Sequence, residues 1–189
     1  MGDTSRLETE RLILRRFTPW DVEALLLIYS DEKTNRFLPW FPIRTKAEAE
    51  RLLRERYLSA YERQEGYGYA VCLREDDRPV GYVHVSPGDS HDLGYGLRSD
   101  CWGRGIATEA AGAVLEQLRR DGVPFVTATH DVENPRSGAV MRRLGMEGVI
   151  AGPTDFLTPA YIDEPVDTAI STSDVVMMLR IQKERQTLW

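Results

Sequence analysis

Apolar side chains recur along the chain with two different periods, and each period predicts one kind of secondary structure. In three segments they return every three or four positions, which places them on one face of an α-helix. Two of these segments open with a capping box, a threonine followed three positions later by an acid. A fourth helix is predicted by an Asn-Pro pair at its start and a glycine at its end. The predicted helices cover residues 19–31, 45–63, 105–120 and 133–145.

Other segments alternate apolar and polar residues or form short apolar runs between turn residues, which predicts β-strands. Three consecutive strands with short polar turns predict an antiparallel meander. The strand, helix and strand between residues 91 and 130 predict a βαβ unit with parallel strands. The expected fold class is α/β, with a mixed sheet that is antiparallel in its first half and parallel at the βαβ step. The predicted strands cover residues 11–17, 67–75, 78–86, 91–99, 125–130, 146–151 and 174–182.

Composition narrows the class of protein without naming a chemistry. The chain has 189 residues, and because it contains no repeat or linker, one domain is expected over residues 1–189. A net charge of −6 argues against a non-specific nucleic-acid binder, which usually carries a basic face. The two cysteines, Cys72 and Cys101, form no metal-ligand pattern, and reduced thiols predict a cytoplasmic protein. No apolar stretch approaches the length of a membrane span, so no membrane partner is expected.

The stretch CWGRGIATEA, residues 101–110, places two glycines directly before a predicted helix. A helix N-terminus offers unpaired N–H donors and a partial positive charge, and preceding glycines let the backbone approach a bulky anion. The stretch therefore suits a phosphate-binding turn. A tight turn that packs a helix on a strand and binds no ligand is the alternative. The residues that would supply amide, hydroxyl or guanidinium groups are Gly103, Arg104, Gly105, Ile106, Ala107 and Thr108.

Longer stretches of the sequence resemble one known family. Residues 102–107 read Trp-Gly-Arg-Gly-Ile-Ala, which is similar to the pyrophosphate motif Gln/Arg-x-x-Gly-x-Gly/Ala of the GNAT superfamily of N-acetyltransferases, except that Trp102 replaces the usual first residue. LGYGLRSDCWGRGIATEA, NPRSGAVMRRLGM and the opening ETERLILRRFTPWDVEAL resemble the RimJ/RimL-type branch, which acetylates protein N-terminal amines, ribosomal proteins among them. The resemblance implies a GNAT fold: a twisted, mostly antiparallel sheet with splayed parallel strands at a central βαβ unit and helices on both faces.

The resemblance also implies where acetyl-CoA binds. In this family the pantetheine arm lies between the two splayed strands and pairs with the backbone of the first, which places Leu97 at the coenzyme. Gly94 and Gly96 alternate in the same strand, which independently suggests a bulge or a close backbone approach. Asn134 matches the family asparagine near the pantetheine, although an asparagine before a proline is also an ordinary helix N-cap.

Two residues are candidates for acid and base catalysis. In RimL-type enzymes a serine at the position of Ser137 protonates the leaving thiolate. Many other members use a tyrosine further along the helix, where this chain has Met141, which cannot donate a proton. Asp92 stands where relatives often carry a glutamate and is the candidate base, with His91 beside it. The alternatives without a catalytic role are that Ser137 is an exposed helical serine and that Asp92 is a carboxylate near a turn.

The expected function is acetyl transfer from acetyl-CoA to a primary amine, with a protein N-terminus as the first choice of acceptor and no metal. Trp40 and Leu38 are expected to border the acceptor cleft, or else to pack in the core or in a homodimer contact. The irregular segment 152–173 is the other expected wall of that cleft. An acetyltransferase for small-molecule amines is the alternative within the same class of enzyme. Two alternatives belong to other classes of protein: a catalytically inactive CoA-binding module and a nucleotide-binding protein.

Overall fold

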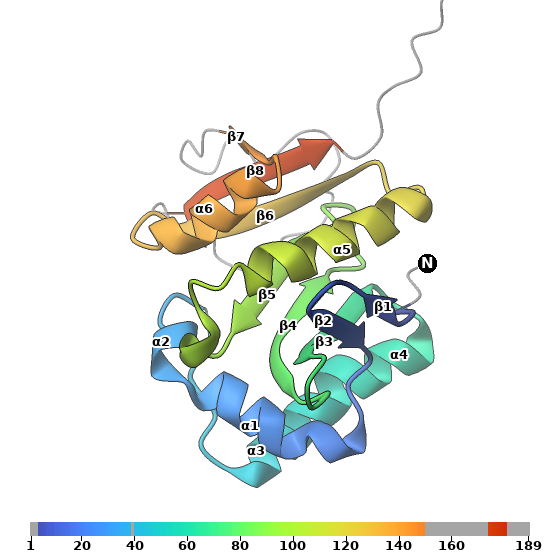
Figure 1. Cartoon of the computed structure of the whole chain (residues 1–189), viewed down its shortest axis with the longest axis vertical. Helices are drawn as coiled ribbons and strands as arrows, with labels where there is room; N and C mark the ends of the chain where they lie inside the picture. The colour runs from blue at the N-terminus through green and yellow to red at the C-terminus, as the bar shows by residue number, and fades with distance from the viewer. Residues whose placement is uncertain (1–3, 39, 150–173, 181–189) are drawn as a thin grey trace, which may run out of the picture.

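A computed structural model describes residues 4–38, 40–149 and 174–180 of the chain. Within them, the strands form two antiparallel sheets, one of order β1-β2-β3-β4-β5 and one of order β6-β8-β7 (Figure 1). The consecutive pairing of β3, β4 and β5 confirms the predicted meander. The strands are β1 (Leu7–Glu8), β2 (Leu12–Arg15), β3 (Tyr67–Leu73), β4 (Pro79–Val85), β5 (Leu93–Leu97), β6 (Phe125–Asp131), β7 (Glu147–Val149) and β8 (Asp174–Arg180).

The four predicted helices are present, and both predicted capping boxes form at their starts. The second of these helices contains a π-helical segment, η2, between two α-helical parts. The sequence pattern did not predict β1 or the one-turn helix α2. The helical elements are η1 (Pro19–Asp21), α1 (Val22–Ser30), α2 (Glu32–Asn35), α3 (Lys46–Leu52), η2 (Leu53–Leu58), α4 (Ser59–Arg63), η3 (Ser99–Cys101), α5 (Ile106–Arg120) and α6 (Pro135–Arg143).

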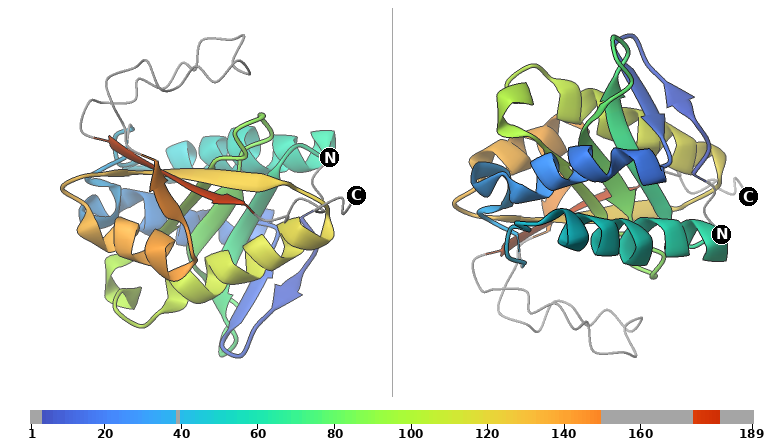
Figure 2. Two further views of the ribbon diagram at one scale, coloured as in Figure 1. Left: turned by 90° about the horizontal axis from the view of Figure 1, so that it is seen from above. Right: turned by 90° about the horizontal axis from the view of Figure 1, so that it is seen from below.

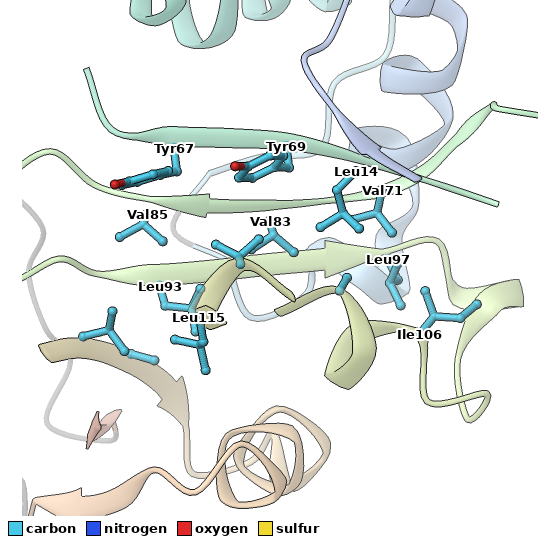
Figure 3. Close-up of a cluster of buried hydrophobic side chains, with 14 of the residues drawn as sticks. Leu14, Tyr67, Tyr69, Val71, Val83, Val85, Leu93, Leu97, Ile106 and Leu115 are labelled. Atoms are coloured by element: carbon cyan, nitrogen blue, oxygen red, sulfur yellow. The ribbon is translucent and has the colours of Figure 1, made fainter. Parts of the chain in front are cut away.

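The five-stranded sheet carries a separate hydrophobic core on each face. Along β3, Tyr67, Tyr69 and Val71 face a core shared with α5, whereas Ala70 and Cys72 face a core shared with α1, α3 and η2. Side chains alternate between the two faces because a strand has a period of two. Figure 3 shows the first core closing against α5, and the end views in Figure 2 show helices on opposite sides of the strands. The expected placement of helices on both faces is confirmed.

The two sheets meet at the predicted βαβ unit, β5–α5–β6. Asp92, just before β5, forms a parallel bridge with Thr127 of β6. The Thr127 N–H also donates to the Ser90 carbonyl at 3.3 Å. Beyond this bridge, β5 continues in the first sheet and β6 in the second. The mixed sheet expected from the sequence is therefore joined by a short parallel contact, from which the two strands separate.

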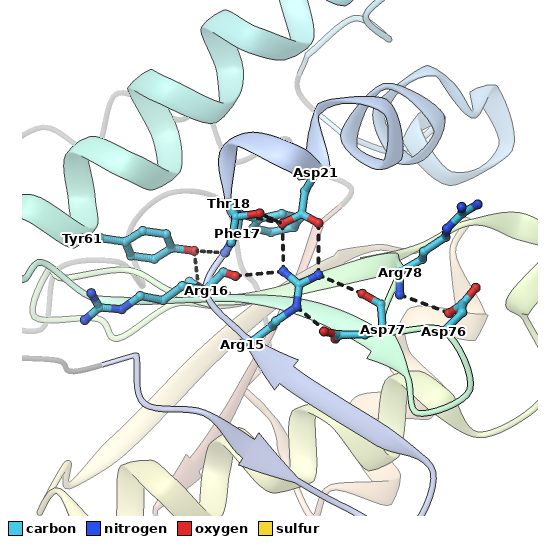
Figure 4. A network of polar contacts seen from close by, with 10 residues as sticks. Arg15, Arg16, Phe17, Thr18, Asp21, Tyr61, Asp76, Asp77 and Arg78 are labelled. Carbon is cyan, nitrogen blue, oxygen red and sulfur yellow. Dashed lines mark hydrogen bonds and ion pairs between the residues drawn. The ribbon is translucent and has the colours of Figure 1, made fainter.

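A buried ion pair fixes the start of α1 against the sheet. Arg15 of β2 makes a two-pronged contact with Asp21, at 2.8 and 3.0 Å, and its Nε bonds Asp77 in the β3–β4 turn (Figure 4). Asp21 also accepts hydrogen bonds from the Thr18 backbone and hydroxyl. Burial raises the pKa of Asp21, but these hydrogen bonds outweigh it, so its pKa lies below the ordinary value. The carboxylate thus stays charged and holds α1 in place.

The second sheet departs from chain order, because β8 lies between β6 and β7. The pattern predicted both outer strands and the last strand, but not this insertion. The predicted irregular segment 152–173 lies outside the described residues. A search of the described helices finds none that is long and apolar enough to cross a membrane.

Candidate active site

The turn before α5 has the backbone geometry of an anion site. Gly103 and Gly105 have φ values of 74° and 77°, which side chains other than hydrogen rarely tolerate. A Cβ placed on Gly103 would meet nothing within 4 Å, so open space lies beside this backbone. The Glu109 N–H makes the first bond back along the helix, to the Gly105 carbonyl at 3.0 Å. The amides of Ile106 and Ala107, at the start of α5, are therefore available to a ligand.

An ion pair from the β1–β2 hairpin holds this turn in place. The Arg11 Nε donates to Glu109 Oε2 at 2.7 Å, and its Nη1 donates to the Arg104 carbonyl at 2.8 Å. Thr9 donates its hydroxyl to Glu109 as well. Burial alone would raise the pKa of Glu109, but the hydrogen bonds from Thr9 and Arg11 lower it by more. The pKa therefore lies below its ordinary value, and the carboxylate stays ionised. Sequence reasoning missed this clamp because its partners lie about a hundred positions apart.

A cleft of about 580 Å³ runs from the turn along β5 to α6. Its walls come from α2, β5, α5 and α6, and Tyr95 and Gly96 form part of its floor. Most of the residues predicted to bind the coenzyme, together with the predicted general acid, lie along this single cleft. They are Leu97, Gly103, Gly105, Ile106, Ala107, Thr108, Asn134 and Ser137.

The remaining predicted residues do not line the cleft. Arg104 contributes its carbonyl to the Arg11 contact beside the turn. Asp92 lies at the bridge between β5 and β6, and Trp40 and Leu38 lie in the α2–α3 connection. The structure thus brings the coenzyme candidates together and places the candidate base and the acceptor-side residues elsewhere.

The backbone of β5 presents one edge to the cleft. The Ser86 N–H donates to the Asp92 carbonyl and the Arg98 N–H to the Val80 carbonyl, so even-numbered residues of β5 bond to β4. In an antiparallel ladder the odd-numbered residues, Tyr95 and Leu97, then point their amide groups away from β4. The Leu97 carbonyl already accepts the Thr34 hydroxyl at 2.6 Å and the Trp102 Nε1–H at 2.9 Å.

Trp102, which replaces the usual polar residue of the pyrophosphate motif, has a defined role in this site. Its indole donates to Leu97 and lines the cleft. The Arg136 guanidinium of α6 lies over the indole ring, 5.3 Å from its centroid. Arg143, also on α6, lines the cleft. Cations from α6 therefore stand near the position where the motif carries glutamine or arginine.

Ser137 lies in the first turn of α6 and is fixed by two neighbours. Its N–H donates to Asn134 Oδ1 at 3.3 Å, so Asn134 is the N-cap of the helix as well as a residue of the cleft. The Tyr95 hydroxyl donates to the Ser137 carbonyl at 2.9 Å and lies 3.0 Å from its Oγ. Burial raises the pKa of Tyr95 to about 12, so the phenol keeps its proton at neutral pH. Met141 is buried in the core, and Tyr95 supplies the phenol near Ser137.

Asp92 faces the opposite side of β5 from Tyr95. Leu93 and Leu97 pack in the α5 core, so the alternation of β5 directs its even-numbered positions toward the α1 side. Burial raises the pKa of Asp92, and a hydrogen bond from Thr127 opposes the rise. The raised pKa is the direction that a general base needs to act near neutral pH. The ring of His91 bonds the Asp89 carbonyl at 2.9 Å.

The two glycines of β5 are explained by side chains of β4. Their register with β4 is continuous, so the suggested bulge is wrong. A Cβ on Gly94 would lie 2.1 Å from the His84 ring, and one on Gly96 would lie 2.7 Å from the Tyr82 ring. The close approach is therefore made by two aromatic rings that cover the α1 side of β5.

Trp40 belongs to the core on that side, and Leu38 is half-buried beside it. The Trp40 Nε1–H donates to Asn35 Oδ1 at 3.3 Å, and the Leu38 N–H donates to the Asn35 carbonyl at 3.1 Å. The Arg56 guanidinium lies over the Trp40 ring at 4.8 Å. A search of the described residues finds no group of three or more His, Cys, Asp or Glu side chains that could hold a metal ion.

Comparisons with known proteins place this geometry in a family. A family model described as an acetyltransferase (GNAT) domain matches residues 11–147. Uncharacterized N-acetyltransferase YoaA from Bacillus subtilis (strain 168) is 23% identical over 151 residues, which cover 76% of this chain and 85% of that protein.

Two solved structures share the fold over nearly their whole length. A candidate ribosomal-protein-serine acetyltransferase from Vibrio cholerae superimposes with a TM-score of 0.73 at 26% identity, covering 95% of this chain and 99% of that one. RimL, a ribosomal L7/L12 α-N-protein acetyltransferase in complex with coenzyme A, has a TM-score of 0.74 at 18% identity, covering 93% and 98%.

The residues of the cleft suit acetyl-CoA. The open backbone at Gly103 and the amides at the N-terminus of α5 can bind the diphosphate of the coenzyme. The family model covers well over half of the sequence and includes the turn, both splayed strands and α6. The chain therefore belongs to the GNAT family of acetyltransferases, with the GNAT fold and acetyl-CoA as its acetyl donor.

Proposed function

We propose that this acetyltransferase acts on the α-amine at a protein N-terminus, as enzymes of the RimJ/RimL-type branch do. The sequence resemblance in β5, α5 and α6 supports this assignment. So do the names of two proteins of the same fold, one acting on ribosomal L7/L12 and the other assigned to a ribosomal-protein serine. The proposal treats residues 1–189 as one catalytic domain.

The observation that carries the proposal is the continuous cleft from the α5 turn to Ser137. In this proposal the amides at the turn bind the diphosphate, the edge of β5 at Leu97 pairs with the pantetheine, and Asn134 contacts it from α6. A thioester at the end of this path would lie beside Ser137, where β5 and β6 separate. The diphosphate-binding residues proposed from the cleft are Gly103, Gly105, Ile106, Ala107 and Thr108. Arg104, between the two glycines, contributes the carbonyl through which Arg11 holds the turn.

The reaction proceeds by direct attack. The neutral amine forms the new C–N bond at the thioester carbon, the C–S bond breaks, and the sulfur leaves as a thiolate. Ser137 Oγ donates a proton to this thiolate, and the Tyr95 hydroxyl at 3.0 Å orients that oxygen. Asp92 accepts the proton lost by the amine, through water. Cys101 lines the cleft but forms no acyl intermediate in this scheme.

The choice of an α-amine agrees with a modest base. Deprotonating an α-amine at pH 7 costs about 1–1.5 kcal/mol, whereas a lysine amine costs roughly 4–5 kcal/mol. Asp92, half-buried at the β5–β6 bridge with a raised pKa, is suited to the smaller task. The α1 side of β5, which Asp92 faces, is also the side of Trp40 and Leu38, and we assign these two residues to the acceptor.

Calorimetry and a panel of acceptors test the proposal. Titration with acetyl-CoA is expected to give saturable binding, and peptides with free N-termini are expected to release CoA faster than the same peptides with blocked N-termini. Lysine side chains in blocked peptides and small amines serve as competing acceptors. Faster transfer to a small amine than to every peptide contradicts the proposed acceptor, and binding without transfer to any amine contradicts catalysis.

A further inference from the structure

Arg56 lies on the α1 side of the sheet between two aromatic rings. Its guanidinium is 4.8 Å from the centroid of Trp40 and 5.9 Å from that of Tyr82. It projects from η2, the π-helical segment, and π-helical insertions occur often at functional sites. The side chain is half-buried, so a ligand can still reach it. We call Arg56, Trp40, Tyr82 and His84 the arginine cluster.

Within the described parts of the chain, the guanidinium of Arg56 has ring contacts but no carboxylate or carbonyl partner. The nearby Tyr29 and Tyr57 hydroxyls bond each other at 2.7 Å. Aromatic faces stabilise a cation but do not accept the N–H bonds of the guanidinium. A half-buried guanidinium whose planar fork is free is the arrangement that binds a carboxylate with two hydrogen bonds.

A second group of the cluster also lacks a partner. The Nδ1 atom of His84 is buried and makes no hydrogen bond to any described residue. Burial, and then the charge of Arg56, lower the pKa of His84 to about 3, so the imidazole is neutral at pH 7. Its ring stacks against Tyr82 at 5.9 Å and covers Gly94 of β5. A cation and a neutral imidazole, both in contact with Tyr82, thus lie on the side of the sheet that Asp92 also faces.

The cluster and the coenzyme cleft meet across one strand. Gly96 lines the cleft, and the Tyr82 ring covers the opposite side of the same glycine. A molecule on Arg56 therefore lies across a single strand from the cleft, and its amine would enter where β5 and β6 separate. We propose that Arg56 binds a carboxylate of the acyl acceptor, which makes amines with a nearby carboxylate the preferred substrates. This inference deepens the proposed function and rests on it; for an N-terminal acceptor the carboxylate is an acidic second residue.

Matched acceptors test the inference. Two peptides that differ only in Asp or Asn at the second residue are compared by kcat/KM, and a free amino acid is compared with its α-amide, which lacks the carboxylate. The wild-type enzyme is expected to favour the carboxylate by about tenfold or more, and Arg56→Gln to abolish this preference without changing acetyl-CoA affinity. Arg54→Gln is the matched control, because Arg54 is an exposed arginine on the same π-helical segment.

Each outcome decides the inference. Equal kcat/KM for acceptors with and without the carboxylate, among both the peptides and the free amino acids, overturns it, and so does a preference that survives Arg56→Gln. A preference that depends on Arg56 only among free amino acids supports carboxylate recognition and assigns it to a small acceptor. Rising salt is expected to reduce the preference of the wild-type enzyme for the carboxylate acceptor. This measurement needs no variant and serves if Arg56→Gln does not fold.

Failure of this inference differs from failure of the proposed function. Transfer to N-terminal peptides without charge preference retains the proposed function and rejects the role of Arg56. If no peptide is acetylated, calorimetric binding of the Asp peptide to the acetyl-CoA-loaded wild type and to Arg56→Gln still tests Arg56. Equal affinity in the two proteins then rejects the inference.

Discussion

The two sides of β5 are built from different parts of the sequence. On the α5 side, the turn and the first turn of α5 come from one continuous stretch, and the backbone amides of that stretch are the groups offered to the diphosphate. On the α1 side, the groups are side chains brought together from the α2–α3 connection, η2 and β4. A ligand that every family member shares can be bound by backbone, whereas side chains can vary with the acceptor.

The largest expected effect comes from changing the backbone on the α5 side. Gly105→Val places a β-branched residue at a φ of 77°, which strains the turn and misaligns the amides at the start of α5. Losing about three charge-assisted hydrogen bonds of roughly 1.5 kcal/mol each corresponds to about a thousandfold weaker binding. Calorimetric titration with acetyl-CoA measures the change.

Gly88→Val is the control for that variant, because a Cβ on Gly88 meets nothing within 4 Å and its φ is not positive. It is expected to bind acetyl-CoA as the wild type does. Normal binding by Gly105→Val would show that the turn does not hold the coenzyme, and the contrast between the two sides of β5 would then disappear.

A smaller effect is expected where the α5 side contributes a reacting side chain. Ser137→Ala removes the proposed proton donor to the thiolate and is expected to lower kcat by about 100-fold, the lower end for general acid catalysis. Acetyl-CoA affinity should stay unchanged, because the turn at α5 is untouched. Steady-state kinetics and calorimetry separate the two quantities. Ser59→Ala, on the remote helix α4, is the control, and a kcat of Ser137→Ala equal to it would remove Ser137 from the mechanism.

The contrast between a site built from one continuous stretch and a site built from distant segments also explains what could be predicted from the sequence. The elements of the meander, the βαβ unit and the residues around Gly103 were predictable, because periodicity and caps are local signals. The resemblance to a family added the expectation that the coenzyme lies along β5, where the structure has a cleft. The alternation of Gly94 and Gly96 was a true signal of close approach, but it could not tell backbone from the rings of Tyr82 and His84.

Contacts between distant positions had no local signal. Arg11 reaches Glu109 across nearly a hundred residues, and Tyr95 reaches Ser137 across 42. In the sequence, Arg56 is one of several arginines on an amphipathic helix. Only the packing of the folded chain shows that it is half-buried against Trp40 while the neighbouring arginines are exposed. The order β6-β8-β7 likewise depends on pairing between strands far apart in the chain.

Two carboxylates, the buried Asp21 and the half-buried Asp92, test whether the α1 side near β5 is built for stability or for function. The pKa of Asp21 is lowered by its partners, so its contribution to stability is present above the unfolded pKa and is lost as the pH falls through the folded value. The pKa of Asp92 is raised, so ionisation of Asp92 opposes folding once the pH exceeds the unfolded pKa. The two groups should therefore respond to neutralisation with opposite signs at pH 7.

Asp21→Asn is expected to lower the free energy of unfolding at pH 7 by about 2 kcal/mol, because it breaks charge-assisted hydrogen bonds with Arg15. Asp92→Asn is expected to raise the free energy of unfolding while reducing kcat/KM and removing the acid limb of the pH–rate profile. Urea unfolding at pH 5 and pH 7 measures the free energy of both variants, and steady-state kinetics measures kcat/KM. A destabilised Asp92→Asn protein with normal kinetics would assign Asp92 to structure alone.

The smallest expected effect concerns the cations that replace the motif's polar residue. Arg136 is exposed and rests on the Trp102 ring, so its charge is screened, and an exposed charge contributes about 0.5–1 kcal/mol. Arg136→Gln should therefore weaken acetyl-CoA binding by about threefold at low salt and by less at high salt. Arg120→Gln, at the far end of α5, removes an equal charge away from the cleft and should leave affinity unchanged. Equal loss in both variants would show that only net charge matters; loss confined to Arg136→Gln would show that side chains of α6, as well as backbone, distinguish the coenzyme side of β5.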